Sequence, residues 1–274
     1  MRTLRTLPRQ HAVAAASLAA FVIASADVHA QKSEEELALA AQNPVAAMVS
    51  VPLQYNYDHN IGPLKDGHKN YINVQPVLPF SLNEDWNLIS RTIVPVVWQS
   101  DVFPGAGSQS GIGDITQSFF FSPKKPSADG WIWGVGPVIY LPTATNDLLG
   151  ADKWGLGPTG VFLKQEHGWT YGALVNHIWS TGGAGRADIN NTYLQPFLSY
   201  TTKSHTSFAV NSESTYDWQR DKWSVPFNFL LRQLVKVGEQ ALQLEAGARY
   251  WATTPDSGAH GWGARFTLTF LFPK

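Results

Sequence analysis

The C-terminal stretch Gln240–Ala252 reads QALQLEAGARYWA, and from Leu242 to Tyr250 it alternates between apolar side chains and polar or small ones. The next stretch, Gly261–Phe272, reads GWGARFTLTFLF and repeats the pattern, with aromatic and aliphatic residues opposite Arg265 and two threonines. A period of two places successive side chains on opposite faces of a β-strand. The end of the chain therefore predicts two strands, each with one apolar face and one polar face.

The same period extends upstream to Val49 and predicts twelve strands. Their expected ranges are Val49–Asp58, Lys69–Phe80, Trp86–Ser100, Gly111–Ser122, Gly130–Pro142, Lys153–Gln165, Gly168–Ser180, Thr192–Thr202, His205–Trp218, Lys222–Val237, Gln240–Ala252 and Gly261–Phe272. Twelve is an even number, as in bacterial single-chain membrane barrels, and a tilted strand of about 10 residues spans a bilayer. The predicted fold is all-β: a transmembrane antiparallel up-and-down β-barrel of about 12 strands with a short N-terminal helix.

Aromatic residues stand at both ends of several predicted apolar faces. The pairs are Trp86 and Trp98, Trp131 and Tyr140, Trp169 and Trp179, and Trp262 and Phe272. A soluble sandwich of two sheets also alternates, but amphipathic rings at both ends of an apolar band are typical of a membrane interface. The composition agrees, because charged residues make up 15% of the chain, against about 25% in soluble domains.

Composition also disfavours other classes of protein. After the first thirty residues, no apolar run approaches the roughly 20 residues that a membrane helix needs. The net charge of −1 argues against a nucleic-acid partner, which requires a basic surface. The chain has no cysteine, so its fold does not rely on disulfide bonds.

Residues 1–30 have the order of a secretory signal peptide. Three arginines precede an alanine-rich apolar stretch, Ala12–Ser25, and Val28-His29-Ala30 offers a cleavage site before Gln31. An N-terminal membrane anchor is the alternative, but the apolar stretch is too short to span a bilayer. We therefore expect export and a location in the bacterial outer membrane.

Residues 31–48 form the predicted N-terminal helical segment, ahead of a barrel over 49–274. Ser33 is placed to cap the helix and Glu36 to complete a capping box, while Pro44 should end or kink it. The helix lies either in the periplasm or in the lumen, and the sequence does not distinguish the two.

Prolines predict irregular strands in the barrel wall, and the lengths of the connections predict its orientation. Many prolines fall inside predicted strands, where each removes a ladder hydrogen bond and favours a bulge or kink. Among them are Pro52, Pro76, Pro95, Pro137, Pro158, Pro196 and Pro226. Short turns at 122–127, 166–168 and 237–239 alternate with longer segments at 101–110, 146–152 and 181–191, which predicts long loops outside the cell.

Several short segments carry a resemblance to a known family. They are Gln42–Ala46, Ser50–Pro52, Asn73–Pro79, Leu82–Thr92, Gly111–Ile115, Trp133–Pro137, Leu141–Thr145, Lys153–Pro158 and Phe270–Lys274. Together they resemble the outer-membrane transporters of the MetA phenol-degradation pathway type, over nearly the whole chain that follows the leader. The resemblance implies an outer-membrane barrel that takes up small compounds, aromatic ones among them, and leaves the cargo undefined.

The polar rows supply the candidate functional residues. A charge on the lipid face would cost about 2–4 kcal/mol at the midplane of the membrane, so these rows should face the lumen. The predicted pore-lining residues are Arg91, Asp114, Asn228, Arg232, Gln243, Glu245, Arg249 and Arg265, with Asn73, Gln75, Thr116 and Thr267 on the same rows. They either select solutes by charge or form a static polar ladder that fills a narrow barrel.

Catalytic and metal sites have weaker support. His205, Ser207 and Asn211 resemble parts of the Ser-His-Asn site of outer-membrane phospholipase A, but their expected position in the lumen keeps them from bilayer lipid. Six histidines, at 59, 68, 167, 177, 205 and 260, lack metal-ligand spacing. Asp147 and Asp152 would hold calcium weakly if at all. We expect no catalytic residue, no metal and no cofactor.

The expected function is passive passage of small molecules, with hydrophobic or aromatic compounds among the candidates. The expected partners are outer-membrane lipid and lipopolysaccharide, the barrel-assembly machinery and a small-molecule solute, with no nucleic acid. Two alternatives stay open: a phospholipase-like barrel hydrolase, and a structural or adhesive barrel that binds partners through its long loops.

Overall fold

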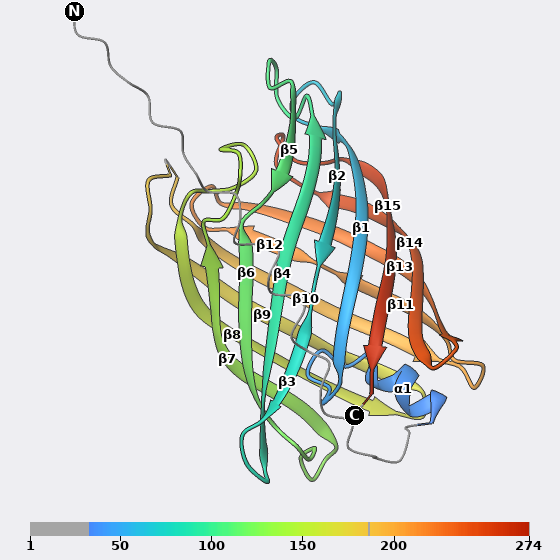
Figure 1. Cartoon of the computed structure of the whole chain (residues 1–274). Helices are drawn as coiled ribbons and strands as arrows, with labels where there is room; N and C mark the ends of the chain where they lie inside the picture. Colours follow the sequence, from blue (N-terminus) through green and yellow to red (C-terminus); the bar gives the residue numbers. More distant parts are fainter. Residues whose placement is uncertain (1–32, 186, 274) are drawn as a thin grey trace, which may run out of the picture.

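The alternating strands pair side by side until the last one meets the first, so the sheet closes into a barrel (Figure 1). The computed structural model describes residues 33–185 and 187–273. The predicted signal peptide over residues 1–30 lies outside the described residues. Within them, no helix is long and apolar enough to cross a membrane.

Within the described residues, one helix, α1 (Glu34–Ala40), is followed by fifteen strands. The strands are β1 (Val49–Ile61), β2 (Gly67–Val74), β3 (Val77–Ser81), β4 (Trp86–Ser100), β5 (Ser108–Ile112), β6 (Ile115–Pro123), β7 (Trp131–Leu141), β8 (Trp154–Glu166), β9 (Trp169–Gly182), β10 (Asn190–Thr201), β11 (Thr206–Ser212), β12 (Ser214–Asp217), β13 (Lys222–Val237), β14 (Gln240–Thr253) and β15 (Gly261–Phe272). Every pairing between them is antiparallel.

Three of the barrel's strands are interrupted, which reconciles fifteen segments with the predicted twelve strands. The breaks fall at Gln75-Pro76 between β2 and β3, at Gly113-Asp114 between β5 and β6, and at Glu213 between β11 and β12. Each pair of segments runs along the same neighbour: β2 and β3 along β4, β5 and β6 along β4, and β11 and β12 along β13. The predicted twelve-stranded antiparallel barrel is therefore confirmed.

The predicted kinks occur at some of the seven prolines named above. Pro76 lies at the first break, where its missing N–H ends the ladder of β2. Pro226 adjoins a register shift between β13 and β14. The other five stay within paired strands, and Pro137 of β7 lies opposite Pro158 of β8.

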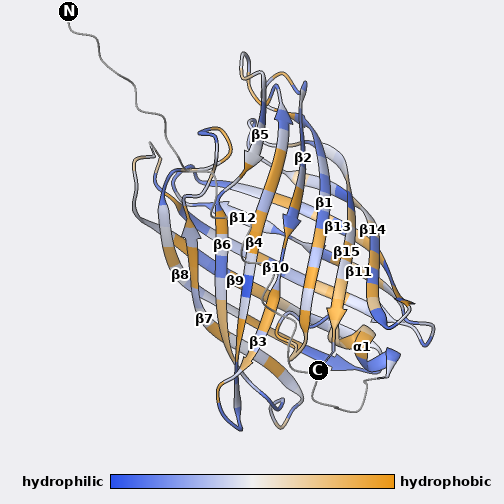
Figure 2. Ribbon diagram, viewed as in Figure 1, coloured by the Kyte–Doolittle hydropathy of each residue, from blue (hydrophilic) through white to orange (hydrophobic). Residues whose placement is uncertain are grey.

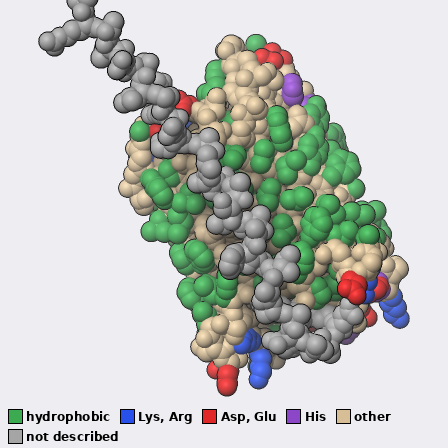
Figure 3. Space-filling view, viewed as in Figure 1, with side chains coloured by type: hydrophobic (Ala, Val, Ile, Leu, Met, Phe, Trp, Pro, Cys, Tyr) green, Lys and Arg blue, Asp and Glu red, His purple; other side chains and the backbone are tan. Residues whose placement is uncertain are grey.

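The last two strands have the predicted two faces. On the outside, Trp262 and Phe266 are 56% and 55% exposed, whereas Arg249 and Arg265 inside the barrel are 2% and 1% exposed. Figure 2 shows apolar and polar residues alternating along the strands. Figure 3 shows hydrophobic side chains over the outer wall and charged side chains at its two ends. The outer wall is therefore apolar along the length of the strands, as contact with lipid requires.

One of the predicted aromatic pairs is wrong. Tyr140 lines the lumen, while Trp131 at the other end of β7 packs against Phe162, a side chain on the outer wall that is 49% exposed. The two residues are nine positions apart, and an odd separation places side chains on opposite faces of a strand. The partners in the other three pairs are separated by an even number of residues.

The connections divide the barrel into a short-turn end and a long-loop end. The short-turn end holds the connections between β3 and β4, β6 and β7, β8 and β9, β10 and β11, and β13 and β14. The turn between β8 and β9 has His167 at φ 52° and Gly168 at φ 83°, as in the tight hairpins that match strand twist. Helix α1 and the end of β15 lie at this same end (Figure 1).

Helix α1 begins with the predicted capping box. The Ser33 Oγ accepts a hydrogen bond of 3.2 Å from the backbone N–H of Glu36, and the Glu36 carboxylate accepts one of 3.0 Å from the N–H of Ser33. The helix ends at Ala40 with Ala41 as its C-cap, so it stops before Pro44. The chain then continues across the barrel mouth to Met48.

Candidate functional site

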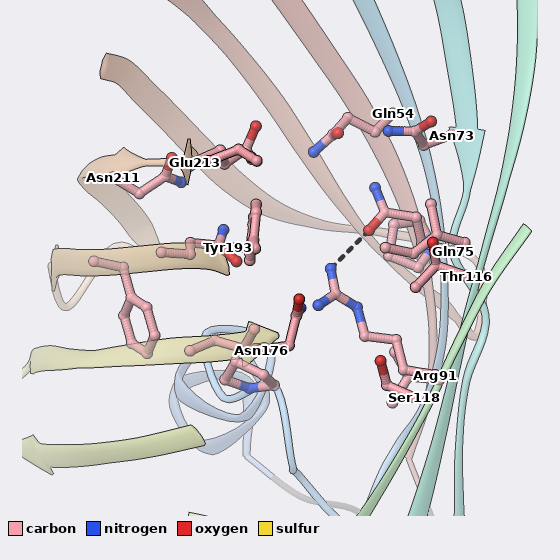
Figure 4. Close-up of a pocket in the computed structure, with 18 of the residues that line it drawn as sticks. Gln54, Asn73, Gln75, Arg91, Thr116, Ser118, Asn176, Tyr193, Asn211 and Glu213 are labelled. Atoms are coloured by element: carbon pink, nitrogen blue, oxygen red, sulfur yellow. Dashed lines mark hydrogen bonds between the residues drawn. The ribbon is translucent and has the colours of Figure 1, made fainter. Parts of the chain in front are cut away.

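The inward rows of side chains enclose a cavity of about 1220 Å³ in the lumen. Polar side chains on its wall come from strands all around the barrel, and Figure 4 shows ten of them: Gln54, Asn73, Gln75, Arg91, Thr116, Ser118, Asn176, Tyr193, Asn211 and Glu213. Apolar side chains interrupt them, among them Ile93, Leu174, Ile178, Phe197 and Leu271. The cavity exceeds the roughly 300–1,000 Å³ of ordinary small-molecule sites.

Helix α1 covers one side of the cavity at the short-turn end. Leu37 and Ala38, 2% and 0% exposed, pack with Met48, Leu234 and Leu271. Beyond this cluster, the Glu34 carboxylate lies 3.1 Å from the Lys236 ammonium and 3.4 Å from the His205 ring. The apolar face of the helix therefore lies against the inside of β13, β14 and β15.

The coil that follows the helix closes the other side. Val45 is 5% exposed and packs with Ile89, Phe120, Val161, Leu163 and Leu174, from β4, β6, β8 and β9. The Asn43 carboxamide accepts a hydrogen bond of 2.9 Å from the Val45 N–H, which fixes the turn before it. We call residues 37–48 the mouth segment, because two apolar clusters anchor them on opposite walls of the barrel.

Gln42 is the polar link between the mouth segment and the lumen. Its amide donates to the Ser207 Oγ at 3.5 Å, and its carbonyl accepts from the Arg232 guanidinium. A side chain of the wall also binds the mouth segment, since Gln165 of β8 donates a hydrogen bond of 2.8 Å to the Leu39 carbonyl. These bonds satisfy backbone and side-chain groups that the segment brings into the barrel.

At the long-loop end, the connection between β7 and β8, residues 142–153, folds over the cavity. The Asp114 carboxylate, at the break between β5 and β6, accepts hydrogen bonds from the Ala144 N–H at 3.0 Å and the Ala151 N–H at 2.6 Å. A Cβ on Gly150 would lie 2.5 Å from both carboxylate oxygens of Asp114, so glycine permits this close approach. Asp114 therefore fixes both ends of the loop.

A second loop, between β9 and β10, contacts the loop between β7 and β8. The Lys153 ammonium donates to the Asp188 carboxylate at 3.0 Å, and the Gly185 N–H donates to the Asp152 carbonyl at 3.0 Å. The hydrogen bond and charge of Lys153 hold the pKa of Asp188 below its usual range. Residues of both loops line the cavity, and together they form its cover at this end, which we call the loop cover.

A buried ionic network fills one side of the lumen. Arg265 donates to both oxygens of Glu213 at 2.7 Å, and Arg249 donates to Glu213 at 3.0 Å and to Asp58 at 3.2 Å. Arg249 further donates to Asn56, Asn228 and Tyr71 at 3.0, 2.9 and 2.6 Å. Two cations thus meet two anions with their donors satisfied, as a buried ion pair requires.

A smaller ion pair lies closer to the mouth segment. The Arg232 Nε donates to Glu245 at 2.6 Å, and the Thr267 hydroxyl donates to the other carboxylate oxygen at 2.6 Å. Because Arg232 also binds Gln42, this pair connects the barrel wall with the mouth segment.

The predicted pore-lining residues divide into two groups. Arg91, Arg232, Gln243, Glu245 and Arg265 border the cavity. Asp114, Asn228 and Arg249 are 6%, 0% and 2% exposed and lie within the loop anchor and the ionic network. Sequence reasoning left Gln42, Asn176 and Tyr193 off the site. The alternation of β9 and β10 contained the signal for the last two, while nothing in the sequence placed Gln42 inside the barrel.

The His-x-Ser pair does not form a catalytic arrangement. His205 adopts φ 61° in the turn before β11 and pairs with Glu34, whereas the Ser207 hydroxyl, 0% exposed, bonds with Thr201 at 2.8 Å and with Gln42. Asn211 instead accepts from Asn228 at 2.7 Å. Among the described residues, no cluster of three or more histidine, aspartate or glutamate side chains is arranged to hold a metal ion.

The fold and the lumen together define an outer-membrane β-barrel of twelve strands. The chain belongs to the family described as "Putative MetA-pathway of phenol degradation", whose model matches residues 66–274. A comparison with curated protein sequences gave no match.

Solved structures share the fold at low sequence identity. An outer membrane channel from Pseudomonas putida F1 superposes with a TM-score of 0.65 at 15% identity, over 82% of this chain and 96% of that one. The NanC porin gives a TM-score of 0.49 at 10% identity, over 82% and 99% of the two chains. Outer membrane phospholipase A from Escherichia coli gives 0.47 at 10% identity, over 84% and 91%.

Proposed function

We propose that this protein is a passive outer-membrane channel for small molecules, with hydrophobic or aromatic compounds as its solutes. The observation that carries the proposal is the lumenal cavity of about 1220 Å³, bordered by the mouth segment at one end and by the loop cover at the other. A barrel filled by a static polar ladder would leave no such space. Here the ladder occupies one side of the lumen and the cavity the other.

The orientation follows from the asymmetry of the connections. Long loops of outer-membrane barrels face outside and short turns face the periplasm. The loop cover would then face the medium and the mouth segment the periplasm. The proposal includes export by the signal peptide at residues 1–30, insertion by the barrel-assembly machinery, and an outer wall in contact with lipid and lipopolysaccharide.

We expect passage of a solute through the barrel to require movement of the mouth segment, of the loop cover or of both. The mouth segment is attached by side-chain packing and a few hydrogen bonds rather than by strand pairing. The loop cover is held by hydrogen bonds to Asp114, by the ion pair of Lys153 with Asp188 and by backbone hydrogen bonds such as that from Gly185 to Asp152. Such attachments open at a lower free-energy cost than the ladders of the wall. The mixed lining, apolar beside polar, suits compounds with a ring or chain and one polar group.

Family membership and the likeness to the Pseudomonas barrel support the same proposal, since the family is described by phenol degradation and that barrel is an outer membrane channel. We further propose that the barrel is not a hydrolase, because the Ser207 hydroxyl bonds with Thr201 and Gln42 rather than with a basic side chain.

Planar-bilayer conductance and liposome swelling of the purified full chain test the proposal. We expect small ion currents and slow entry of small solutes in the wild type, and larger ones when the mouth segment is loosened. Empty liposomes and liposomes with heat-denatured protein are the controls. A barrel that passes neither ions nor any solute, before and after loosening, would overturn the channel.

A further inference from the structure

The arginines of the lumen differ in the groups that they bind. Arg232 pairs with Glu245, Arg249 with Asp58 and Glu213, and Arg265 with Glu213. Arg91 instead donates a hydrogen bond of 2.9 Å to the Gln75 Oε1, and within the described part of the chain it forms no ion pair. Its charge therefore meets an amide dipole where the other three arginines meet carboxylates.

Glu213 forms no hydrogen bond or ion pair with Arg91 in the described structure. Both of its oxygens accept from Arg265, and one also accepts from Arg249. Asp58 and Glu245 pair with Arg249 and Arg232, so among these four arginines of the described structure Arg91 is the one without a carboxylate partner. Arg91 lies on the wall of the cavity. A cation sheltered from bulk water favours an anionic partner, because the effective dielectric constant there is low.

The guanidinium of Arg91 is presented to the cavity. Figure 4 shows it pointing from β4 into the open space, toward Asn176 and Tyr193 on the facing wall, with Gln75 on one side. A guanidinium carries five N–H donors in a planar fork, and that fork matches the two oxygens of a carboxylate. Gln75 occupies one nitrogen, which fixes the orientation of the group and leaves the other donors for a ligand.

The surroundings of Arg91 are apolar as well as polar. Val77 is its partner across the β3–β4 ladder, and Ile93 is the next side chain on the same face of β4. Both line the cavity, as does Leu174 on β9. An anion bound at Arg91 therefore has apolar wall beside it, which suits an organic acid better than a small inorganic ion.

We propose that Arg91, oriented by Gln75, binds the carboxylate of a small organic acid whose apolar or aromatic body lies against Val77 and Ile93. This inference rests on the proposed function, since it places a binding site for the solute on its path through the barrel. It specifies the solute class as small amphipathic carboxylates, aromatic ones among them.

Isothermal titration of the full chain in lipid nanodiscs tests the inference, with benzoate as the probe and benzamide as its neutral counterpart. We expect benzoate to bind the wild type at least tenfold more tightly than benzamide or inorganic phosphate. Arg91→Gln should weaken benzoate binding tenfold or more, and Arg91→Lys should retain part of it, because the charge stays while the fork is lost.

Arg220→Gln is the matched control. Arg220 also lines the cavity, but at the long-loop end, where it is exposed and paired with Asp217 at 2.7 Å. This variant should bind benzoate as the wild type does. Equal binding of benzoate by wild type and Arg91→Gln, absence of benzoate binding, or equally tight binding of phosphate would each overturn the inference.

The two proposals fail separately. Conductance and swelling without benzoate binding would leave a channel with no carboxylate site. Benzoate binding that depends on Arg91, in a barrel closed to every ion and solute, would leave a carboxylate site in a protein that is not a channel.

Discussion

Glu213 binds Arg265 through both carboxylate oxygens, each at 2.7 Å, although β13 and β14 lie between their positions in the wall. Glu213 occupies the break between β11 and β12, and from there its side chain enters the lumen. The contact ties two distant parts of the wall together through the interior. The break between β11 and β12 therefore places the Glu213 carboxylate where it can bind Arg265.

Replacing this carboxylate should destabilise the barrel. Glu213→Gln leaves Arg249 and Arg265 buried with Asp58 as their remaining carboxylate, and breaking a buried ion pair costs about 3–5 kcal/mol. Urea unfolding in detergent micelles, followed by tryptophan fluorescence, measures the loss. Glu239→Gln, in the exposed turn between β13 and β14, is the control and should unfold like the wild type. Equal midpoints for all three proteins would contradict a structural role for the network.

Loss of the Asp114 charge should loosen the loop cover. Asp114→Asn weakens two hydrogen bonds to a charged acceptor, each worth about 1.5–3 kcal/mol, so opening of residues 142–153 should become at least about tenfold more frequent. Hydrogen–deuterium exchange of peptides from this loop reports the opening. Asp147→Asn makes the same change in the same loop at an exposed position, and should leave exchange unaltered. Equal exchange in both variants would show that Asp114 is not the anchor.

Removing the two apolar anchors should release the mouth segment. Truncating a buried leucine costs about 2–5 kcal/mol, so Leu37→Ala combined with Val45→Ala should free the segment while the strand ladders persist. We expect a larger single-channel conductance together with unchanged β-sheet circular dichroism. Leu39→Ala, on the same helix but outside the cluster, should change the conductance less. A conductance that stays at the wild-type level would mean that the segment is not the barrier.

The ion pair in the loop cover should respond to acid. Lys153 holds the pKa of Asp188 below the ordinary 3.8, so its contribution is complete above that ordinary value and is lost as the pH falls through the lowered one. The loop between β9 and β10 should therefore become more mobile in strong acid, and the pair should also weaken in high salt because the Asp188 side chain is exposed.

A spin label measures this mobility at one position. The chain has no cysteine, so Ala187→Cys gives a single attachment point next to Asp188. Label mobility should rise as the pH falls below the ordinary 3.8 and through the lowered pKa of Asp188. With Asp188→Asn added, mobility should be high at every pH. A wild-type spectrum that does not change with pH would contradict the role of the pair.

The sequence predicted the faces of the strands because side-chain direction in a strand depends on parity alone. Leu244 and Glu245 go to opposite sides whatever the rest of the chain does. The same rule places Trp131 and Tyr140, nine positions apart, on opposite faces of β7, although both are aromatic. The number of strands was also predictable, since local turns punctuate the alternation.

Tertiary structure decided which inward side chains border open space. Arg91 and Arg249 have the same sequence signature, an arginine on the polar face of a strand, yet one lines the cavity and the other is buried with Asp58 and Glu213. The difference depends on partners up to 193 residues away and on the path of the mouth segment across the barrel. Parity fixes the direction of a side chain, whereas closure of the sheet and the segments folded into it determine what that side chain meets.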